Sequence, residues 1–187
     1  MFASGRMAHA WYPTQYRVGL RDEQVFQVSQ SCENWCWAAC CQSVFATSGF
    51  DVPQEQFVQK AFGTSTTCAT ATGRMIQETV DGPWVDQQGH RLIANSKVVF
   101  DRLHSISIGD PVRAIADELY HGRPMLIGTQ GHAMIITYLH YSQNNNFGLN
   151  IHSMRVFDPD PIRPRIRELS AQEQRDAEFL ATVSFTA

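Results

Sequence analysis

Gln30-Ser31-Cys32-Glu33-Asn34-Trp35-Cys36-Trp37-Ala38-Ala39-Cys40 is the stretch from which the fold can be read. It runs directly into a segment that stays mostly apolar as far as Phe45. A helix that is apolar on every side belongs inside a domain. With Asn34 as the N-cap, we expect this helix to begin at Trp35. The stretch therefore predicts a buried central helix with a cysteine at its N-terminus.

Cys36 would lie in the first turn of that helix. The positive end of the helix dipole and the unpaired amide N–H groups there favour the thiolate, which is the nucleophilic form of the side chain. A free cysteine is also among the most often buried residues and is usually inert. Cys36 is therefore a candidate nucleophile, and its role depends on partners elsewhere in the chain.

Length and composition limit the classes of protein that the chain can belong to. The 187 residues suit a single domain over residues 1–187, and 43% hydrophobic residues can supply a core. A net charge of −3 does not favour binding to nucleic acid or to an anionic membrane surface. No apolar run is long enough to cross a bilayer, and residues 1–16 lack the apolar core of a secretory signal. We therefore expect a cytoplasmic location in the producing cell.

The cysteine pattern favours neither a disulfide framework nor a metal site. There are five cysteines, four of them within ten residues of one another. An odd and clustered set is not typical of a small disulfide-stabilised secreted domain. The spacing contains no C-x-x-C pair, and no nearby histidine completes a zinc-finger pattern. We therefore expect no metal and no cofactor.

The two halves of the chain differ in pattern. Helical signals dominate the first half, and strand signals dominate the second, which is an α+β order with a helical lobe at about residues 25–95 and a β lobe at about 96–187. Ser142 to Asn150 is a polar turn that would join two antiparallel strands. The expected helices after the central one are 53–62, 73–80, 110–122 and 171–179, and the expected strands are 16–20, 25–28, 97–108, 124–129, 133–140, 151–157 and 180–185.

A nucleophilic cysteine needs a base, and the base needs an orienting group. Of seven histidines, His132 is the best candidate, because it follows Gly131 and opens an apolar strand. Asp158 ends a later strand, just before Pro159. If the two strands pair as a hairpin, Asp158 returns to the side of His132. The alternatives are a packing role for His132, a simple turn at Asp158, and Asp160 as the orienting group.

Gln30 could supply the remaining part of an acyl-transfer site. Such a site needs donors directed at the developing oxyanion, each worth about 3–4 kcal/mol when removed. The side-chain amide of Gln30 and the backbone N–H of Cys36 could provide two of them. The position of Gln30, six residues before the cysteine, is what makes it a candidate.

Three short blocks together resemble the papain-like cysteine peptidases. They occur in the family's order within residues 25–160, and they are Gln30-x5-Cys36-Trp37, Gly131-His132-Ala133 and Val156-Phe157-Asp158-Pro159. The chain is most similar to the compact bacterial branch, which includes the double-glycine leader peptidases and a plant-pathogen effector protease. The resemblance implies a papain-like α+β fold, with a helical half that carries the nucleophile packed against an antiparallel sheet.

The resemblance also implies a role for each candidate residue. Cys36 would be the nucleophile, His132 the general base, Asp158 the orienting group and Gln30 the oxyanion donor. Papain has Asn as its third member, whereas Asp fits the bacterial branch. Papain also has a small residue where this chain has the bulky Trp35, so the non-primed side of the cleft is expected to differ.

One disulfide is a further implication of the resemblance. In papain, the cysteine that corresponds to Cys32 is bonded to another about forty residues later, and Cys68 is placed to form this bond here. A reducing compartment would argue against the bond. The favoured expectation is that both thiols are free.

The leading functional prediction is a cysteine endopeptidase that cleaves protein or peptide substrates through an acyl-enzyme intermediate. The alternative is a protein deamidase, transglutaminase or acyltransferase with the same triad, because these enzymes share nucleophile, base and oxyanion hole. A binding module that has kept the fold is a third class. Size, the absent signal sequence and the resemblance suggest a bacterial effector or toxin domain. It would be delivered into another cell by a specialised secretion system and controlled by a cognate inhibitor or immunity protein.

Overall fold

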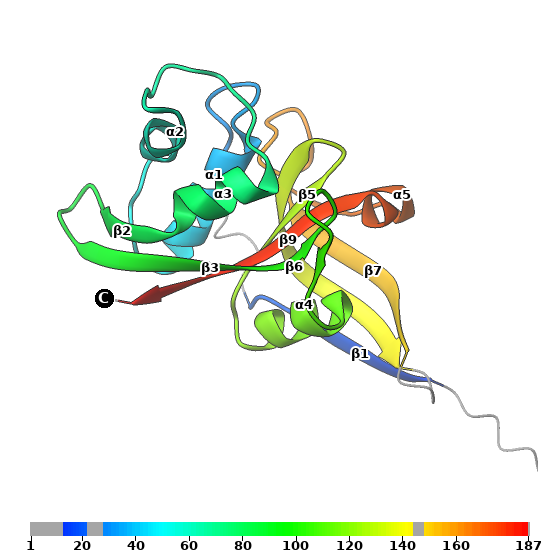
Figure 1. Cartoon of the computed structure of the whole chain (residues 1–187). Coiled ribbons are helices and arrows are strands. Elements are labelled where there is room, and N and C mark those ends of the chain that lie inside the picture. The colour runs from blue at the N-terminus through cyan, green and yellow to red at the C-terminus, as the bar shows by residue number, and fades with distance from the viewer. Residues whose placement is uncertain (1–12, 22–27, 144–147, 187) are drawn as a thin grey trace, which may run out of the picture.

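A nine-stranded antiparallel sheet forms the framework of the molecule (Figure 1). The computed structural model describes residues 13–21, 28–143 and 148–186. The main path of the sheet runs β2-β3-β9-β5-β6-β7-β8, while β1 pairs with β6 and β4 pairs with β3. The strands are β1 (Thr14–Gly19), β2 (Gly82–Val85), β3 (Arg91–Asp101), β4 (Ile106–Ser107), β5 (Met125–Thr129), β6 (His132–Gln143), β7 (Leu149–Phe157), β8 (Ile166–Glu168) and β9 (Ala177–Thr186).

Helices cover both faces of the sheet, and a separate apolar cluster lies beneath each cover. Figure 1 shows α1, α2 and α3 on one side and α4 on the other. The cluster on the α1 face includes Trp37 and Phe157, and the cluster on the α4 face includes Leu119 and Val156. The helices are α1 (Cys36–Thr47), α2 (Gln54–Phe62), α3 (Gly73–Val80), α4 (Pro111–Tyr120) and α5 (Ala171–Arg175).

The central helix is buried as predicted, but it begins differently. Nine of the residues of α1 are buried, including both aromatic ones. The N-cap is Trp35, with no side-chain cap hydrogen bond. Asn34 instead donates from Nδ2 to the backbone carbonyl of Cys68, so the prediction of Asn34 as N-cap is wrong. The tertiary contact takes the side chain away from the first turn of the helix.

Local signals located the other helices of the first two-thirds well. Gly63 ends α2 in the left-handed conformation at φ +72°, as a helix C-terminus favours. Asp110 caps α4 through its side chain, and Pro111 is the first helical residue. α3 has the predicted bounds, with Thr72 as its N-cap.

Two features of the division into halves differ from the sequence-based expectation. The sheet begins earlier, because β2 and the first part of β3 lie before residue 96. The helix expected at 171–179 is only the five residues of α5, after which β9 enters the middle of the sheet between β3 and β5. The strand expected at 25–28 lies mostly outside the described residues. The molecule is thus a mixed helical and sheet structure rather than two cleanly separated halves.

Candidate active site

Cys36 is the first residue of α1, and its thiol lies against the start of β6. Its residue exposure is 7%, and its Sγ accepts a hydrogen bond from the backbone N–H of Ala133 at 3.4 Å. The N–H groups of the first helical turn have no partners within the helix, which gives this end of α1 a positive partial charge.

His132 reaches the thiol because a tight hairpin places it at the start of β6. Thr129 pairs with His132, and the two residues between them, Gln130 and Gly131, both have positive φ, at 51° and 73°. Two positive φ angles are the signature of a type I′ turn, which joins antiparallel strands. The imidazole forms a hydrogen bond of 2.6 Å from Nε2 with Oδ1 of Asp158, and it lies near enough to Cys36 for that side chain to raise its pKa.

Asp158 comes to His132 through the pairing of β6 with β7. Ile135 lies opposite Phe157, so the residue after β7 lies beside the beginning of β6. The carboxyl group is fully buried. It also accepts hydrogen bonds from Arg167 Nε at 2.8 Å and from the backbone N–H of Asp160 at 3.1 Å. The hairpin expected from the sequence is therefore present and brings the two groups together.

The charges of the site reinforce one another. Burial alone would lower the pKa of His132, but hydrogen bonds to Asp158 and Cys36, and the charges of both, raise it to about 9. Burial would raise the pKa of Asp158, but hydrogen bonds from His132 and Arg167 bring it below its ordinary value. The imidazolium is therefore the stable form of His132 near neutral pH.

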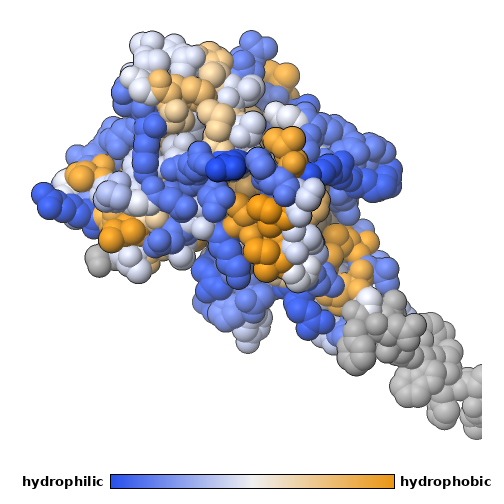
Figure 2. Space-filling model, in the orientation of Figure 1, coloured by the Kyte–Doolittle hydropathy of each residue, from blue (hydrophilic) through white to orange (hydrophobic). Residues whose placement is uncertain are grey.

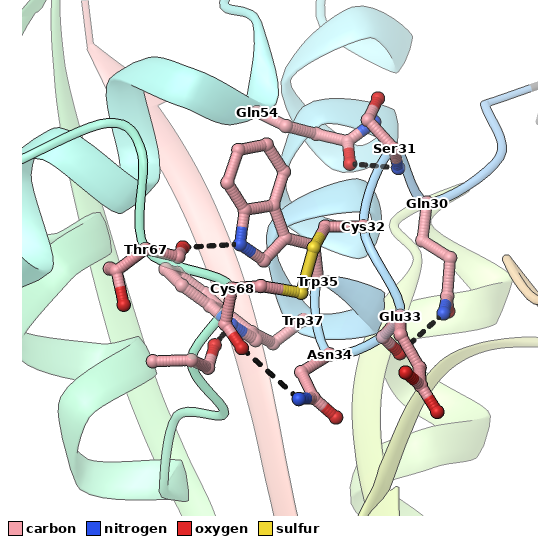
Figure 3. The surroundings of a disulfide bond; sticks show 11 residues. Gln30, Ser31, Cys32, Glu33, Asn34, Trp35, Trp37, Gln54, Thr67 and Cys68 are labelled. Atoms are coloured by element: carbon pink, nitrogen blue, oxygen red, sulfur yellow. Dashed lines mark hydrogen bonds between the residues drawn. A yellow bond between two sulfur atoms is a disulfide. The ribbon is translucent and has the colours of Figure 1, made fainter.

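The side chains of Gln30 and Asp160 lie near the site but form no hydrogen bond with His132 or Asp158. The Nε2 of Gln30 donates to the carbonyl of Glu33 at 2.6 Å, as Figure 3 shows. Its Oε1 is buried and has no partner among the described residues. The backbone N–H of Gln30 donates to the carbonyl of Pro159, which ties this residue to the loop after Asp158. The carboxyl of Asp160 faces Arg163 rather than His132.

The segment before α1 is bonded to the loop at residues 64–72 (Figure 3). Cys32 and Cys68 form a disulfide with a Cα–Cα distance of 5.9 Å, so the expectation of two free thiols is wrong. The indole Nε1 groups of Trp35 and Trp37 donate to the carbonyls of Thr67 and Ala69, at 2.9 and 3.2 Å. The position of the loop at residues 64–72 is therefore fixed relative to α1.

That loop forms one wall of a cavity of about 600 Å³ that opens beside Cys36 and His132. Ala71, Ile76 and Phe179 give the cavity an apolar floor. Gly73 is needed here, because a Cβ at this position would overlap the ring of Phe179. The turn after β3 forms another wall and carries Leu103, which is 74% exposed. Cys36 thus lies at the edge of an open, largely apolar cleft.

Sequence reasoning missed three contacts of the site. Ala133 acts through its backbone, which no side-chain pattern reveals. Arg167 and Glu173 follow a loop rich in proline and arginine, where charge usually indicates an exposed surface. Only the pairing of β8 with β7 turns Arg167 toward Asp158.

Neither a group of metal ligands nor a helix able to cross a bilayer is present among the described residues. No group of three or more His, Cys, Asp or Glu side chains suited to a metal ion occurs among the described residues. Within the same ranges, no helix has the length and apolar character needed to cross a bilayer.

Comparison with known proteins adds little to this geometry. No family model matches the chain, and no curated protein matches it. One matching solved structure is the crystal structure of UfSP from C. elegans, with a TM-score of 0.49 and 13% identity. The match covers 95% of this chain and 35% of the UfSP chain, so this chain spans about a third of that protein's length. A similarity this weak carries no argument about fold or activity.

Proposed function

We propose that this protein is a cysteine endopeptidase with a papain-like arrangement of Cys36, His132 and Asp158. The observation that carries the proposal is the 2.6 Å hydrogen bond between His132 and the buried Asp158 carboxyl, with the same imidazole beside Cys36 on the wall of the cavity. A nucleophile, a base and an orienting group in contact form the constellation that acyl transfer requires.

The two nitrogens of His132 have different tasks in this mechanism. Nε2 is bonded to Asp158, so Nδ1 is the atom that faces Cys36. The Cys36 thiolate attacks the carbonyl carbon of the scissile peptide bond. The proton on Nδ1 then passes to the leaving amine, the C–N bond breaks, and a thioester remains on Cys36. His132 next takes a proton from water, the hydroxide displaces the thiolate, and the carboxylic acid product leaves.

The oxyanion of each tetrahedral intermediate needs donors. The backbone N–H of Cys36, in the first turn of α1, is one candidate. The side-chain amide of Gln30 is the other candidate, because one of its two N–H groups is bonded to Glu33 and the second would bind the oxyanion. We propose that both donors contact the oxyanion when a substrate is bound.

The cleft supports a polypeptide substrate. It extends from the nucleophile past the loop at 64–72 to the turn at 101–103, and its open side can admit an extended chain. The apolar floor suits an apolar side chain on one side of the scissile bond. On the face shown in Figure 2, apolar patches are separated by hydrophilic side chains, so this view does not single out one docking surface for an inhibitor.

The Cys32–Cys68 disulfide supports action outside a reducing cytoplasm. Disulfides persist in oxidising compartments and are reduced in the cytosol of most cells. This agrees with an effector or toxin domain that is exported after synthesis, and a cognate inhibitor or immunity protein would protect the producing cell. Co-expression of the active domain with and without neighbouring genes tests that idea, since unprotected growth of the producer would contradict it.

The first experiment compares the wild type with Cys36→Ala on a cell lysate, read by N-terminal proteomics. We expect new N-termini with the wild type and none with the variant. A mass increase of about 1 Da without cleavage, lost in the variant, would instead identify a deamidase, and an added acyl or amine group would identify a transferase.

Iodoacetamide labelling provides the control for the thiol itself. Burial and the nearby Cys36 thiolate raise the pKa of Cys41 to about 12, and burial also raises the pKa of Cys40. Labelling near neutral pH should therefore be confined to Cys36. No labelling and no product would contradict the catalytic proposal and favour a binding module.

A further inference from the structure

Arg167 holds the oxygen of Asp158 that His132 does not use. Its Nε donates to Oδ2 at 2.8 Å, while His132 occupies Oδ1 at 2.6 Å. The other end of the guanidinium is held by Glu173, with Nη2 to Oε1 at 2.7 Å and Nη1 to Oε2 at 3.2 Å. Nη2 also lies 3.0 Å from the sulfur of Met134. Nη1 also donates to the backbone carbonyl of Glu168 at 3.3 Å, so each nitrogen of the guanidinium has a partner.

The sheet explains how the arginine reaches the carboxylate. In the pairing of β7 with β8, Arg167 lies opposite Val156. Asp158 follows Val156 by two residues, so both project from the same side of the strand, and a long side chain can reach a diagonal neighbour. Val156 belongs to the apolar cluster on the α4 face, and Cys36 belongs to the cluster on the α1 face. Arg167 therefore approaches the carboxylate from the face opposite the nucleophile.

The other charged groups around Asp158 are less well placed to hold it. Arg163 lies 3.9 Å from Oδ2, and its side chain is 49% exposed. Asp160 offers its backbone N–H, while its carboxyl faces Arg163. The side chains of Arg167 and Glu173 are only 15% and 14% exposed. Among the described residues, Arg167 is the arginine that lies closest to the carboxylate, at 2.8 Å.

We propose that Arg167 is a positioning residue that fixes the Asp158 carboxylate toward His132, and that Glu173 fixes Arg167 in turn. The inference deepens the proposed function, since it assumes that Cys36, His132 and Asp158 form the reacting site. A carboxylate held by one hydrogen bond can rotate about its last side-chain torsion. A planar guanidinium bonded at both ends prevents that rotation and keeps Oδ1 directed at the imidazole.

Glu173 can be tested without disturbing the helix that it belongs to. It lies at the third position of α5 and completes a capping box with Ser170. A glutamine at that position also completes a capping box. Glu173→Gln therefore removes the ion pair with Arg167 and leaves the cap in place. Ser170→Ala does the reverse, because it removes the cap and leaves the ion pair.

The decisive measurement is the proton NMR signal of the His132 Nε2–H group, which a hydrogen bond as short as 2.6 Å shifts far downfield. We expect Arg167→Gln and Arg167→Lys to move this signal upfield or broaden it, because lysine keeps the charge but not the planar fork. Peptide cleavage should fall about 10–100-fold in kcat with little change in KM, the range for partners one step from a reacting group. Glu173→Gln should shift the signal in the same direction and lower kcat severalfold.

Two controls separate positioning from general loss of stability. Arg123 and Glu118 form another double hydrogen-bonded ion pair, at 2.7 and 3.0 Å, away from the site. Arg123→Gln and Ser170→Ala should lower the melting temperature and leave both the His132 signal and kcat as in the wild type. If Arg167→Gln does not fold, the comparison of Glu173→Gln with Ser170→Ala still decides the question.

An unchanged His132 signal and unchanged kcat in folded Arg167→Lys and Glu173→Gln would overturn the proposal. Rescue of both readouts by Arg167→Lys alone would also overturn it, because charge without the fork would then be enough. The NMR readout does not require peptidase activity. A wild type that shows the downfield signal but no cleavage would therefore count against the proposed function and not against the role of Arg167.

Discussion

At the scale of single residues, the site alternates in charge from α1 to α5. In the proposed site, the Cys36 thiolate is followed by the His132 imidazolium, the Asp158 carboxylate, the Arg167 guanidinium and the Glu173 carboxylate. Each of the three inner groups has an opposite charge on each side along this chain, which reduces the cost of removing it from water. The same alternation makes the whole set sensitive to the loss of any one member.

The raised pKa of His132 gives a pH dependence with a definite sign. The imidazolium donates the proton to the leaving amine, so kcat/KM should fall as the pH rises through about 9. Because the folded pKa lies above the ordinary value of 6.5, the associated stability is full below pH 6.5 and is lost as the pH rises through about 9. An NMR titration of the histidines measures the pKa of His132. Urea unfolding of the wild type and of His132→Gln, below pH 6.5 and above about pH 9, measures the associated stability.

His140 provides an internal reference in the same titration. Burial and the nearby charges of Arg17 and His152 lower its pKa below 6.5. The two histidines should therefore titrate on opposite sides of the ordinary value. A midpoint for His132 close to 6.5 would contradict the proposed ion pair with Cys36 and Asp158.

At the scale of elements, four links join residues 32–37, at and just before the start of α1, to the loop at 64–72. They are the Cys32–Cys68 disulfide and the hydrogen bonds from Asn34, Trp35 and Trp37. The loop has no regular secondary structure of its own, and it forms a wall of the cleft. Its conformation is therefore fixed by the same segment that positions the nucleophile.

Removal of the disulfide should loosen both the domain and this wall. We expect Cys32→Ser with Cys68→Ser to lower the free energy of unfolding by about 2–4 kcal/mol, since the bond closes a long loop in the unfolded chain. Limited proteolysis should then cut within residues 64–72. Urea unfolding with and without a reductant measures the effect. The reductant should destabilise the wild type alone, and equal sensitivity of the double variant would show that another mechanism is responsible.

At the scale of the whole molecule, the last strand of the chain holds the sheet together. β9 lies between β3 and β5, which connects the β2-β3 hairpin to the strands that carry His132 and Asp158. Phe179 of the same strand forms part of the cleft floor. A substitution that displaces the C-terminal strand should therefore unfold the sheet and disrupt the candidate site at the same time.

Two substitutions on β9 test this coupling. Ala181 is 1% exposed, whereas Ser184 on the same strand is exposed. Ala181→Asp should lower the free energy of unfolding by more than about 3 kcal/mol, because it buries an uncompensated charge. Ser184→Asp should change it by no more than about 0.5 kcal/mol. Thermal unfolding by circular dichroism compares the two, and a similar, small effect of both would show that β9 is not a central strand.

Several parts of the molecule could be predicted from the sequence because their signals are local. An apolar run predicted the buried helix α1, and Asp110-Pro111 predicted the start of α4. A glycine before His132 and a proline after Asp158 marked the two ends that a hairpin brings together. These features depend on residues within one turn or one strand, so the chain itself carries them.

The tertiary structure alone decided the remaining features. The pairing of β9 with β3 and β5 and the contact of Asn34 with Cys68 each join segments distant in the sequence. Backbone hydrogen bonds are alike whichever strands pair, so a local sequence pattern does not show which strands become neighbours. The sequence determined which residues could react, and the packing of distant strands decided what holds them in place.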